Sequence, residues 1–310
     1  MKLSIRCKLY LIYIISILFI NSNLSQRNNP IIIDADTANE VDDLFAIVSA
    51  ILEPSFEILG ISSAQFHTSP IASNSSTLES QLINSEILQL LKFNTTLPLG
   101  AFNPIINKNT PQISEASNFI IKSAHKLEKG KRLKLIILGS CTNVSSAIIQ
   151  DPSIIPKIEV FYLGFWHDSK SNSYNKNEFN TRNDPIALEV LLNTIDLQFN
   201  VMSATTSQYL VFNKNKVDIV LKGKGGISDY LVNRWESYNR WWTDLDKDKK
   251  QWIMWDLALI EAISKPSLAK KKLFHTPKEN IDRIISIYTS INEKDMQEYF
   301  WSKLESLSKD

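Results

Sequence analysis

The chain has 310 residues, of which 44% are hydrophobic and 22% are charged, and its formal net charge at pH 7 is +1. A chain of this length can bury a large core, and its near-neutral charge lacks the positive excess of nucleic-acid-binding proteins. With two cysteines, Cys7 and Cys141, it is not a disulfide-rich scaffold.

The N-terminus has the pattern of a secretory signal peptide. Lys2, Arg6 and Lys8 precede an uncharged and largely apolar run over residues 9–20. This run is shorter than the roughly 20 residues that a membrane-spanning helix needs. We therefore predict that residues 1–25 are a signal that is cleaved on export, with an uncleaved anchor as the alternative.

Removal of this segment defines the mature protein that we expect. Residues 26–310 form one domain, which is exported to the periplasm or secreted and has no stable membrane insertion. The three positive charges and Cys7 leave with the signal, so the formal charge changes from +1 to −2 and Cys141 remains as the only cysteine. No nucleic-acid partner is expected at this charge.

An acidic turn follows the first predicted strand. Residues 30–33 are an apolar run typical of a buried strand, and apolar residues recur at helical spacing over residues 41–52. Between and within these segments lie five carboxylates, those of Asp34, Asp36, Glu40, Asp42 and Asp43. One or two are ordinary at a helix N-terminus, but five repel one another, and a hard cation with oxygen ligands relieves the repulsion. A solvated acidic cap is the alternative.

Further strands and helices alternate along the chain. We predict strands at residues 56–61, 133–138, 158–163 and 195–201, helices at residues 78–93, 115–127, from about 144, 185–192 and 227–242, and an irregular polar loop at residues 167–176. This alternation favours an α/β fold, with a mostly parallel twisted sheet and helices on both faces. Ligands bind at the carboxyl ends of such strands, so we expect polar turns to meet there, at residues 34–43, 62–67, 139–143 and 164–180.

The acidic turn also resembles a known metal-binding signature. Asp34-Ala35-Asp36 followed by Asp42-Asp43 is similar to D-x-D-P-G-x-D-D of the inosine-uridine preferring nucleoside hydrolase family. Here the gap is two residues longer, and Thr37-Ala38 replaces Pro-Gly. The resemblance implies a Rossmann-like nucleoside hydrolase fold, a calcium cofactor, and hydrolysis of the N-glycosidic bond of ribonucleosides to base and ribose.

Two later segments are similar to motifs of the same family. Gly139-Ser140-Cys141-Thr142-Asn143 is similar to G-P-L-T-N, which implies that the Thr142 carbonyl binds the metal. A helix cap by Thr142 or Asn143 is the alternative. Glu178-Phe179-Asn180 followed by Asp184-Pro185 is similar to E-F-N-x-x-x-D-P, which implies ribose binding by Glu178 and Asn180. In an extended segment these two residues point the same way, and Phe179 turns into the core.

The C-terminal third carries the largest departure from the family pattern. Asp256 matches the aspartate of the family's H-D motif, but Trp255 stands where the histidine is expected. An indole N–H has no proton to give at a useful pKa, so the acid that protonates the leaving base must be another group. His67 and His167 are the candidates. A surface or hydrogen-bonded role is the alternative for each, and we favour it for His167.

The resemblance implies roles for the whole residue set. Ca²⁺ is bound by Asp36, Asp43, the Thr142 carbonyl and Asp256. Asp36 takes a proton from a calcium-bound water, Asp42 holds a ribose hydroxyl, and Asp34 orients the neighbouring ligands. The expected partner is a small nucleoside, with the base preference left open.

Aromatic residues are concentrated near the predicted helix at residues 227–242, namely Tyr230, Trp235, Tyr238, Trp241 and Trp242. We interpret them as core or as a subunit contact rather than as a base-stacking platform, and a homo-oligomer stays open.

Two other functions remain open at this point. A strand followed by D-x-D also begins the haloacid-dehalogenase-type phosphatases, in which Asp34 would be the nucleophile and Asp36 the acid. That fold prefers Thr or Val where this chain has Ala38. The second alternative is a ribose- or nucleoside-binding protein of the same fold that lost catalysis with the change to Trp255.

Overall fold

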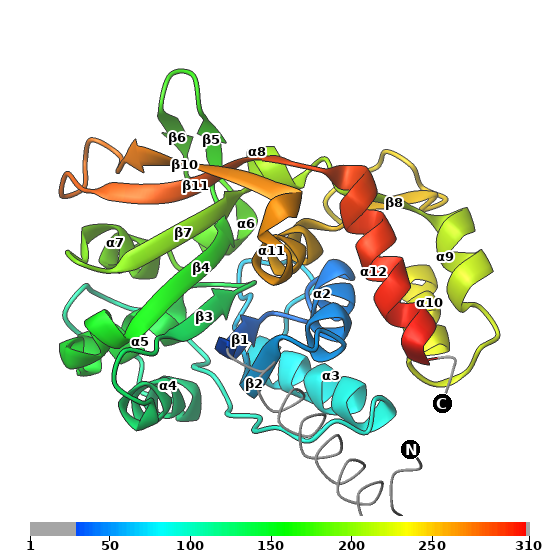
Figure 1. Cartoon of the computed structure of the whole chain (residues 1–310), viewed down its shortest axis with the longest axis horizontal. Helices are drawn as coiled ribbons and strands as arrows, with labels where there is room; N and C mark the ends of the chain where they lie inside the picture. The colour runs from blue at the N-terminus through cyan, green and yellow to red at the C-terminus, as the bar shows by residue number, and fades with distance from the viewer. Residues whose placement is uncertain (1–28, 308–310) are drawn as a thin grey trace, which may run out of the picture.

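A computed structural model describes residues 29–307 of the chain. The predicted signal peptide lies outside these residues. Seven strands form one twisted sheet in the order β10-β11-β7-β4-β3-β1-β2, and every neighbouring pair is parallel except β10 and β11 (Figure 1). The strands are β1 (Asn29–Ala35), β2 (Phe56–Ser63), β3 (Leu133–Ile137), β4 (Ile158–Gly164), β7 (Gln198–Ser203), β10 (Ala269–His275) and β11 (Ile284–Ile291).

Helices cover both faces of this sheet, as the sequence predicts. Neighbouring residues of one strand point to opposite faces, so Ile31 and Ile33 pack on one side and Ile32 on the other. The first face is covered mainly by α2 (Asp42–Ile51), α3 (Ser76–Leu90), α10 (Gly226–Ser237), α11 (Trp255–Ser264) and α12 (Glu293–Leu307). The second face is covered by α4 (Glu115–Lys126), α5 (Thr142–Gln150) and α7 (Pro185–Asn193). The mostly parallel α/β fold is therefore confirmed.

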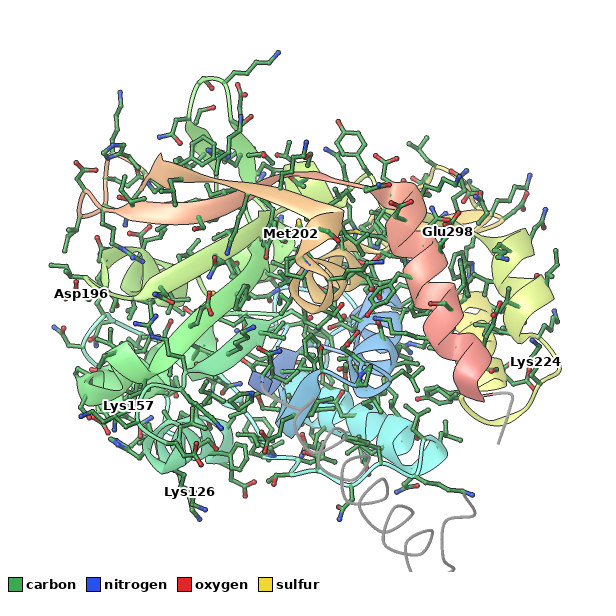
Figure 2. All side chains as sticks on the ribbon, in the orientation of Figure 1. Lys126, Lys157, Asp196, Met202, Lys224 and Glu298 are labelled. Carbon is green, nitrogen blue, oxygen red and sulfur yellow. The ribbon has the colours of Figure 1, made fainter. Side chains whose placement is uncertain are left out.

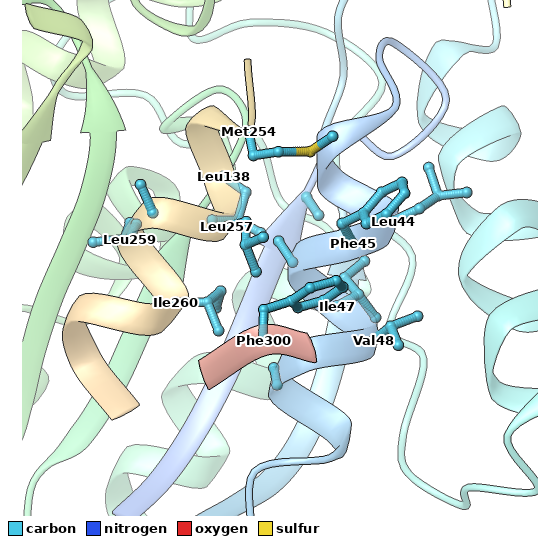
Figure 3. Close-up of a cluster of buried hydrophobic side chains, with 14 of the residues drawn as sticks. Leu44, Phe45, Ile47, Val48, Leu138, Met254, Leu257, Leu259, Ile260 and Phe300 are labelled. Carbon is cyan, nitrogen blue, oxygen red and sulfur yellow. The ribbon is translucent and has the colours of Figure 1, made fainter. Parts of the chain in front are cut away.

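Helices α2 and α11 pack side by side through a dry cluster. Phe45 of α2 lies with its ring centroid 5.8 Å from that of Phe300 in α12, and Met254 and Leu257 complete the contact at the start of α11 (Figure 3). Burial of each such side chain contributes about 1.5–3 kcal/mol to stability. The cluster holds the two helices so that both begin at the same edge of the sheet.

Three local expectations are wrong. Residues 167–176 are not an irregular loop, because β5 (Trp166–Asp168) and β6 (Ser173–Asn175) pair as an antiparallel hairpin that projects from the molecule (Figure 1). The strand expected from residue 195 begins at Gln198, since Ile195 is exposed. Helix α10 ends at Ser237, five residues before the predicted end.

The remaining elements are short or lie outside the sheet. They are α6 (Phe179–Asn183), α8 (Ala204–Ser207), α9 (Lys214–Leu221), the antiparallel pair β8 (Val211–Asn213) and β9 (Gln251–Ile253), and the 3₁₀ turns at Pro152–Lys157 and Pro266–Leu268.

Polar and apolar side chains separate as expected for a folded domain. Met202 is buried in the sheet, whereas Lys126, Lys157, Lys224 and Glu298 lie at the periphery (Figure 2). Within residues 29–307, no helix has both the length and the apolar character needed to cross a membrane.

Candidate functional site

A cavity of about 510 Å³ opens at the carboxyl ends of the parallel strands. Its acidic lining residues are Asp36, Glu40, Asp42, Asp43, Glu178 and Asp256, and its aromatic lining residues are Trp166, Phe179, Trp241, Trp242 and Trp255. These residues come from segments that are up to 220 positions apart in the sequence. The cavity therefore combines a charged floor with aromatic walls at the edge where α/β sheets bind ligands.

Two helix N-termini bring the central carboxylates together. Helix α2 begins with Asp42 and Asp43, and Asp256 lies in the first turn of α11. One oxygen from each of these buried carboxylates lies within 4.8 Å of the others. The backbone N–H of Asp256 donates to Asp42 Oδ2 at 3.0 Å, which ties the two helices directly. Helix N-termini favour negative charge, but that effect is too small to balance three buried carboxylates.

Burial makes these carboxylates hard to ionise. Desolvation, opposed by hydrogen bonds from backbone N–H groups, raises the pKa of Asp42 to about 6. The pKa values of Asp36, Asp43 and Asp256 are raised well above the ordinary value, first by desolvation and then by repulsion from neighbouring aspartates.

Several carboxylate oxygens in the site also lack hydrogen-bond donors. In the described part of the chain, Asp36 Oδ2, Asp43 Oδ1 and Asp256 Oδ1 are buried and have no partner. Oxygen atoms of this kind are the ligands that calcium prefers. The donor set therefore fits a hard divalent cation, which would both neutralise the repulsion and satisfy these oxygens.

Asp34 lies beneath the cavity lining and holds neighbouring turns in place through hydrogen bonds. It is buried but does not line the cavity, and its Oδ1 accepts hydrogen bonds from Ser62 Oγ at 2.6 Å and Asn143 Nδ2 at 2.9 Å. Desolvation raises its pKa to about 6, and these two hydrogen bonds oppose the increase. Of the four polar turns expected at one crevice, the turn at residues 62–67 thus contributes support rather than lining.

In the turn after β3, Leu138 lines the cavity, whereas the expected residue Thr142 does not. Thr142 is the first residue of α5, lies outside the cavity lining, and donates its hydroxyl to Asp184 Oδ2 at 2.7 Å. Leu138 lines the cavity, and its carbonyl accepts a hydrogen bond from Asn180 Nδ2 at 2.8 Å. A Cβ at the following Gly139 would lie 2.9 Å from Ala64 Cβ and 3.0 Å from Asp36 Cβ, so a larger residue there would displace one of these neighbours.

The prediction that residues 178–180 are extended is wrong. Glu178 is the N-cap of α6, and its carboxylate accepts from the backbone N–H groups of Asn180 and Thr181 at 2.9 and 3.0 Å. Burial raises the pKa of Glu178. Phe179 does not turn into the core but lines the cavity, with its ring 5.8 Å from that of Trp241. Glu178 and Asn180 both line the cavity, as expected for ribose contacts.

Neither candidate histidine lines the cavity. His67 is exposed, and its Nδ1 lies 2.5 Å from Gln65 Oε1. His167 lies in the β5–β6 hairpin, where Nε2 is 3.0 Å from Asn172 Oδ1, and desolvation lowers its pKa. Trp255, which stands where the family motif has histidine, lines the cavity instead. Its ring packs edge to face against that of Trp166, with the ring centroids 5.9 Å apart.

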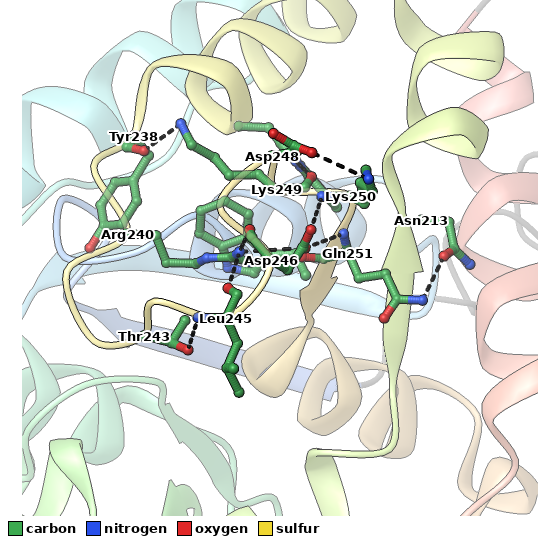
Figure 4. Close-up of polar contacts among 12 residues, drawn as sticks. Asn213, Tyr238, Arg240, Thr243, Leu245, Asp246, Asp248, Lys249, Lys250 and Gln251 are labelled. Carbon is green, nitrogen blue, oxygen red and sulfur yellow. Dashed lines mark hydrogen bonds and ion pairs between the residues drawn. The ribbon is translucent and has the colours of Figure 1, made fainter.

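The aromatic stretch near α10 has two roles. Trp235 and Tyr238 are buried in the core, as interpreted, but Trp241 and Trp242 follow the helix and line the cavity. The loop that carries them is fixed by Arg240, which donates to the carbonyls of Leu245 and Gln251 (Figure 4). Trp241 also packs against the core, as interpreted, but the sequence does not predict that both side chains line the cavity, because the helix ends before them.

Comparisons with known proteins agree with this architecture. Residues 31–283 match the family model described as inosine-uridine preferring nucleoside hydrolase. The search of curated proteins found no match.

Solved structures share the fold at low sequence identity. A plant nucleoside hydrolase superposes with a TM-score of 0.70 at 14% identity, covering 89% of this chain and 99% of its own. An inosine-guanosine nucleoside hydrolase gives a TM-score of 0.69 at 15% identity, with 90% and 99% covered. The purine-preferring ribonucleoside hydrolase from Gardnerella vaginalis gives 0.66 at 16% identity, with 91% and 99% covered. Because the family model spans most of the described residues, the chain belongs to the inosine-uridine preferring nucleoside hydrolase family.

Proposed function

We propose that this protein hydrolyses the N-glycosidic bond of ribonucleosides, releasing base and ribose at a calcium centre. The main support is the coexistence, in one cavity, of buried carboxylate oxygens that lack partners and of aromatic walls. The carboxylates suit a cation and ribose hydroxyls, and the aromatic rings suit a flat base. Membership of a nucleoside hydrolase family supports a nucleoside as the molecule that this combination binds.

The calcium ligands would come from the acidic floor. Asp36, Asp43 and Asp256 each have a buried oxygen without a partner. We assign the main-chain ligand to Leu138 rather than to Thr142, because Leu138 lines the cavity and Thr142 does not. Bound calcium supplies Lewis-acid chemistry, since it lowers the pKa of a water that it coordinates.

The protein residues would divide the remaining work. Asp36 accepts the proton of the attacking water as general base. Asp42 lines the cavity together with Glu178 and Asn180, so these three side chains can hold the ribose hydroxyls. Water attacks the anomeric carbon, the C–N bond breaks, and its electron pair leaves with the base. The surrounding carboxylates stabilise the positive charge that develops on the sugar.

The base would be bound, and would leave, among the aromatic side chains that line the cavity. No histidine of the described residues lines it, so we do not assign protonation of the base to His67 or His167. Trp166, Trp241 and Trp255 offer faces and edges on which a base can stack. We expect purine ribonucleosides to bind more tightly than pyrimidine ribonucleosides, because a larger ring buries more surface against these indoles.

A nucleoside-binding protein without catalysis is the second candidate. Trp255 in place of the expected histidine favours it, since no histidine of the described residues lines the cavity. The phosphatase alternative has lost its support, because Asp34 does not line the cavity and the chain matches another family.

Reducing-sugar release from a panel of purine and pyrimidine ribonucleosides tests the proposal. We expect ribose release that requires calcium and stops with a chelator. Binding of nucleosides without ribose release would overturn the hydrolase and favour the binding protein. Secretion is a separate proposal, and N-terminal sequencing of the exported protein should find that residues 1–25 are absent.

A further inference from the structure

Asn39 is a lining residue to which the proposed chemistry gives no role. The residue is 5% exposed and lines the cavity. Its Oδ1 is buried and has no hydrogen-bond partner among the described residues. A buried amide carbonyl without a donor is unfavourable, so its position in a cavity wall indicates that a ligand supplies the donor.

The turn that carries Asn39 is held rigidly. The backbone N–H of Asn39 donates to the Asp36 carbonyl at 2.7 Å, and the Asn39 carbonyl accepts from the Tyr238 hydroxyl. Arg234 Nη2 donates to the Ala38 carbonyl at 2.6 Å. These contacts fix the backbone on both sides of the residue. The side chain is therefore presented by an ordered turn, which lowers the entropy lost when a ligand binds.

Further contacts connect the turn that carries Asn39 with aromatic residues of the cavity. Its neighbour Glu40 accepts a hydrogen bond from Trp252 Nε1 at 2.8 Å. The Arg240 guanidinium lies 5.1 Å from the Trp252 ring and 5.5 Å from the ring of Trp242, which lines the cavity. Through Trp252 and Arg240, the turn is thus linked to Trp242 of the cavity lining, and we place the base on this side of the cavity.

Ribose already has its own partners in the proposed function. Asp42, Glu178 and Asn180 offer oxygen and amide groups to the sugar hydroxyls. The part of a nucleoside that remains without a polar partner is the edge of the base. A side-chain carbonyl can distinguish bases at that edge. It accepts a hydrogen bond from a base that has a ring N–H, and it stays without a partner when the base lacks one.

We propose that Asn39 is a specificity-determining residue whose side-chain carbonyl accepts a hydrogen bond from a ring N–H at the edge of the base. This inference rests on the proposed function and adds a substrate class to it, namely nucleosides whose base carries a ring N–H. Inosine has such a group on its six-membered ring. Unsubstituted purine riboside has the same ring system without it.

The matched pair of substrates provides the test. We expect Asn39→Leu, which keeps the approximate size of the side chain, to lower kcat/KM for inosine about tenfold and for purine riboside less than twofold. Asn109→Leu, at an exposed loop position, should change neither value. Equal losses for both substrates would overturn the proposal, since Asn39 would then act on the sugar or on the fold. Asn39→Ala replaces Asn39→Leu if the latter does not fold.

Equilibrium binding separates this inference from the proposed function. Quenching of tryptophan fluorescence in the presence of calcium measures the affinity for each nucleoside without turnover. If the wild type binds both nucleosides but hydrolyses neither, the hydrolase proposal fails. A tenfold loss of affinity for inosine alone in Asn39→Leu would still support the role of Asn39. Equal losses of affinity, or no binding of either nucleoside by the wild type, would overturn it.

Discussion

Buried carboxylates form two groups at different levels along helices α2 and α11, and the two groups differ in how their charge is balanced. At their N-termini, Asp42, Asp43 and Asp256 face the cavity. Oxygens of Asp43 and Asp256 lack hydrogen-bond partners, and no lysine or arginine within the described ranges forms an ion pair with any of the three.

The second level lies roughly 8–9 Å further along the same helices. There Ser49 Oγ donates to Glu261 Oε1 at 2.6 Å, and Lys303 Nζ donates to Glu261 Oε2 at 3.0 Å. Lys303 Nζ is also 3.7 Å from Glu53 Oε2, which accepts from the Tyr299 hydroxyl at 2.6 Å. Every carboxylate at this level has a partner from the protein itself.

The difference separates a structural charge cluster from one that needs a ligand. Burial of charge is unfavourable unless it is paired, and the lower cluster meets that requirement without help. The upper cluster, Asp42, Asp43 and Asp256, does not meet it, although α11 contributes a carboxylate to each cluster. Substitutions at the two levels should therefore change different properties. Those at the upper level should lower activity, and those at the lower level should lower the free energy of unfolding.

The largest effect is expected for Asp36→Asn. Removal of the general base should lower kcat about thousandfold, which corresponds to about 4 kcal/mol. The folded state in chelator should be at least as stable as the wild type, because one repelling charge is gone. Ribose release and thermal unfolding measure the two quantities, with the exposed Asp248→Asn as control. Activity close to that of the wild type would remove Asp36 as the base.

Lys303→Met should act on folding instead. It leaves Glu261 and Glu53 buried without their cation, so the free energy of unfolding should fall by about 3–4 kcal/mol. Chemical denaturation measures this loss, and Lys294→Met, at an exposed position of the same helix, should change stability by less than about 0.5 kcal/mol. A loss no larger than that of the control would show that the lower cluster does not depend on this pair.

The pH dependence of stability in chelator sharpens the comparison. The pKa of Asp34 is raised from 3.8 to about 6, so the folded state binds this proton more tightly than the unfolded state. Its contribution is fully present below pH 3.8 and is lost as pH rises through 6, a loss of about 3 kcal/mol. Asp34→Asn should lack this contribution, so its stability should fall correspondingly less between pH 4 and 7. Identical pH profiles for both proteins would contradict the assignment.

Calcium-linked stabilisation gives the smallest expected effect. At a calcium concentration of about 100 times Kd, the wild type should gain about 2.7 kcal/mol of stability. Asp43→Ala should lose this gain, because the variant lacks a carboxylate of the upper cluster. Thermal unfolding with and without calcium measures it, and Asp244→Ala in an exposed loop should retain the full shift. An undiminished shift in Asp43→Ala would exclude Asp43 as a ligand.

The elements that could be predicted from the sequence are those determined by neighbouring residues. The acidic turn and the start of α2 follow from a dense run of carboxylates before a helical apolar pattern, and β3 from a continuous apolar run. Strands β10 and β11 are not predicted, and β10 shows why. It is a sheet edge with exposed lysines at positions 270–272, so it lacks the apolar alternation that marks a half-buried strand.

The site was harder to predict wherever distant residues meet. Asp256 was placed only through its resemblance to a family motif, because no local pattern connects it with Asp42. The sequence predicts a helix that continues through Trp241 and Trp242, but α10 ends before them. Asn39 gave no signal in the sequence, since a buried oxygen without a partner is recognisable only when every neighbour is in place.

The bond between the Asp256 N–H and Asp42 Oδ2 joins residues that are 214 positions apart. Because closure of so long a loop has a high entropic cost, we expect this contact to form late in folding. The nascent acidic turn therefore has no complete cation site until the chain is almost fully folded. Calcium, if it binds as proposed, should slow the unfolding of the finished protein and leave its rate of folding unchanged.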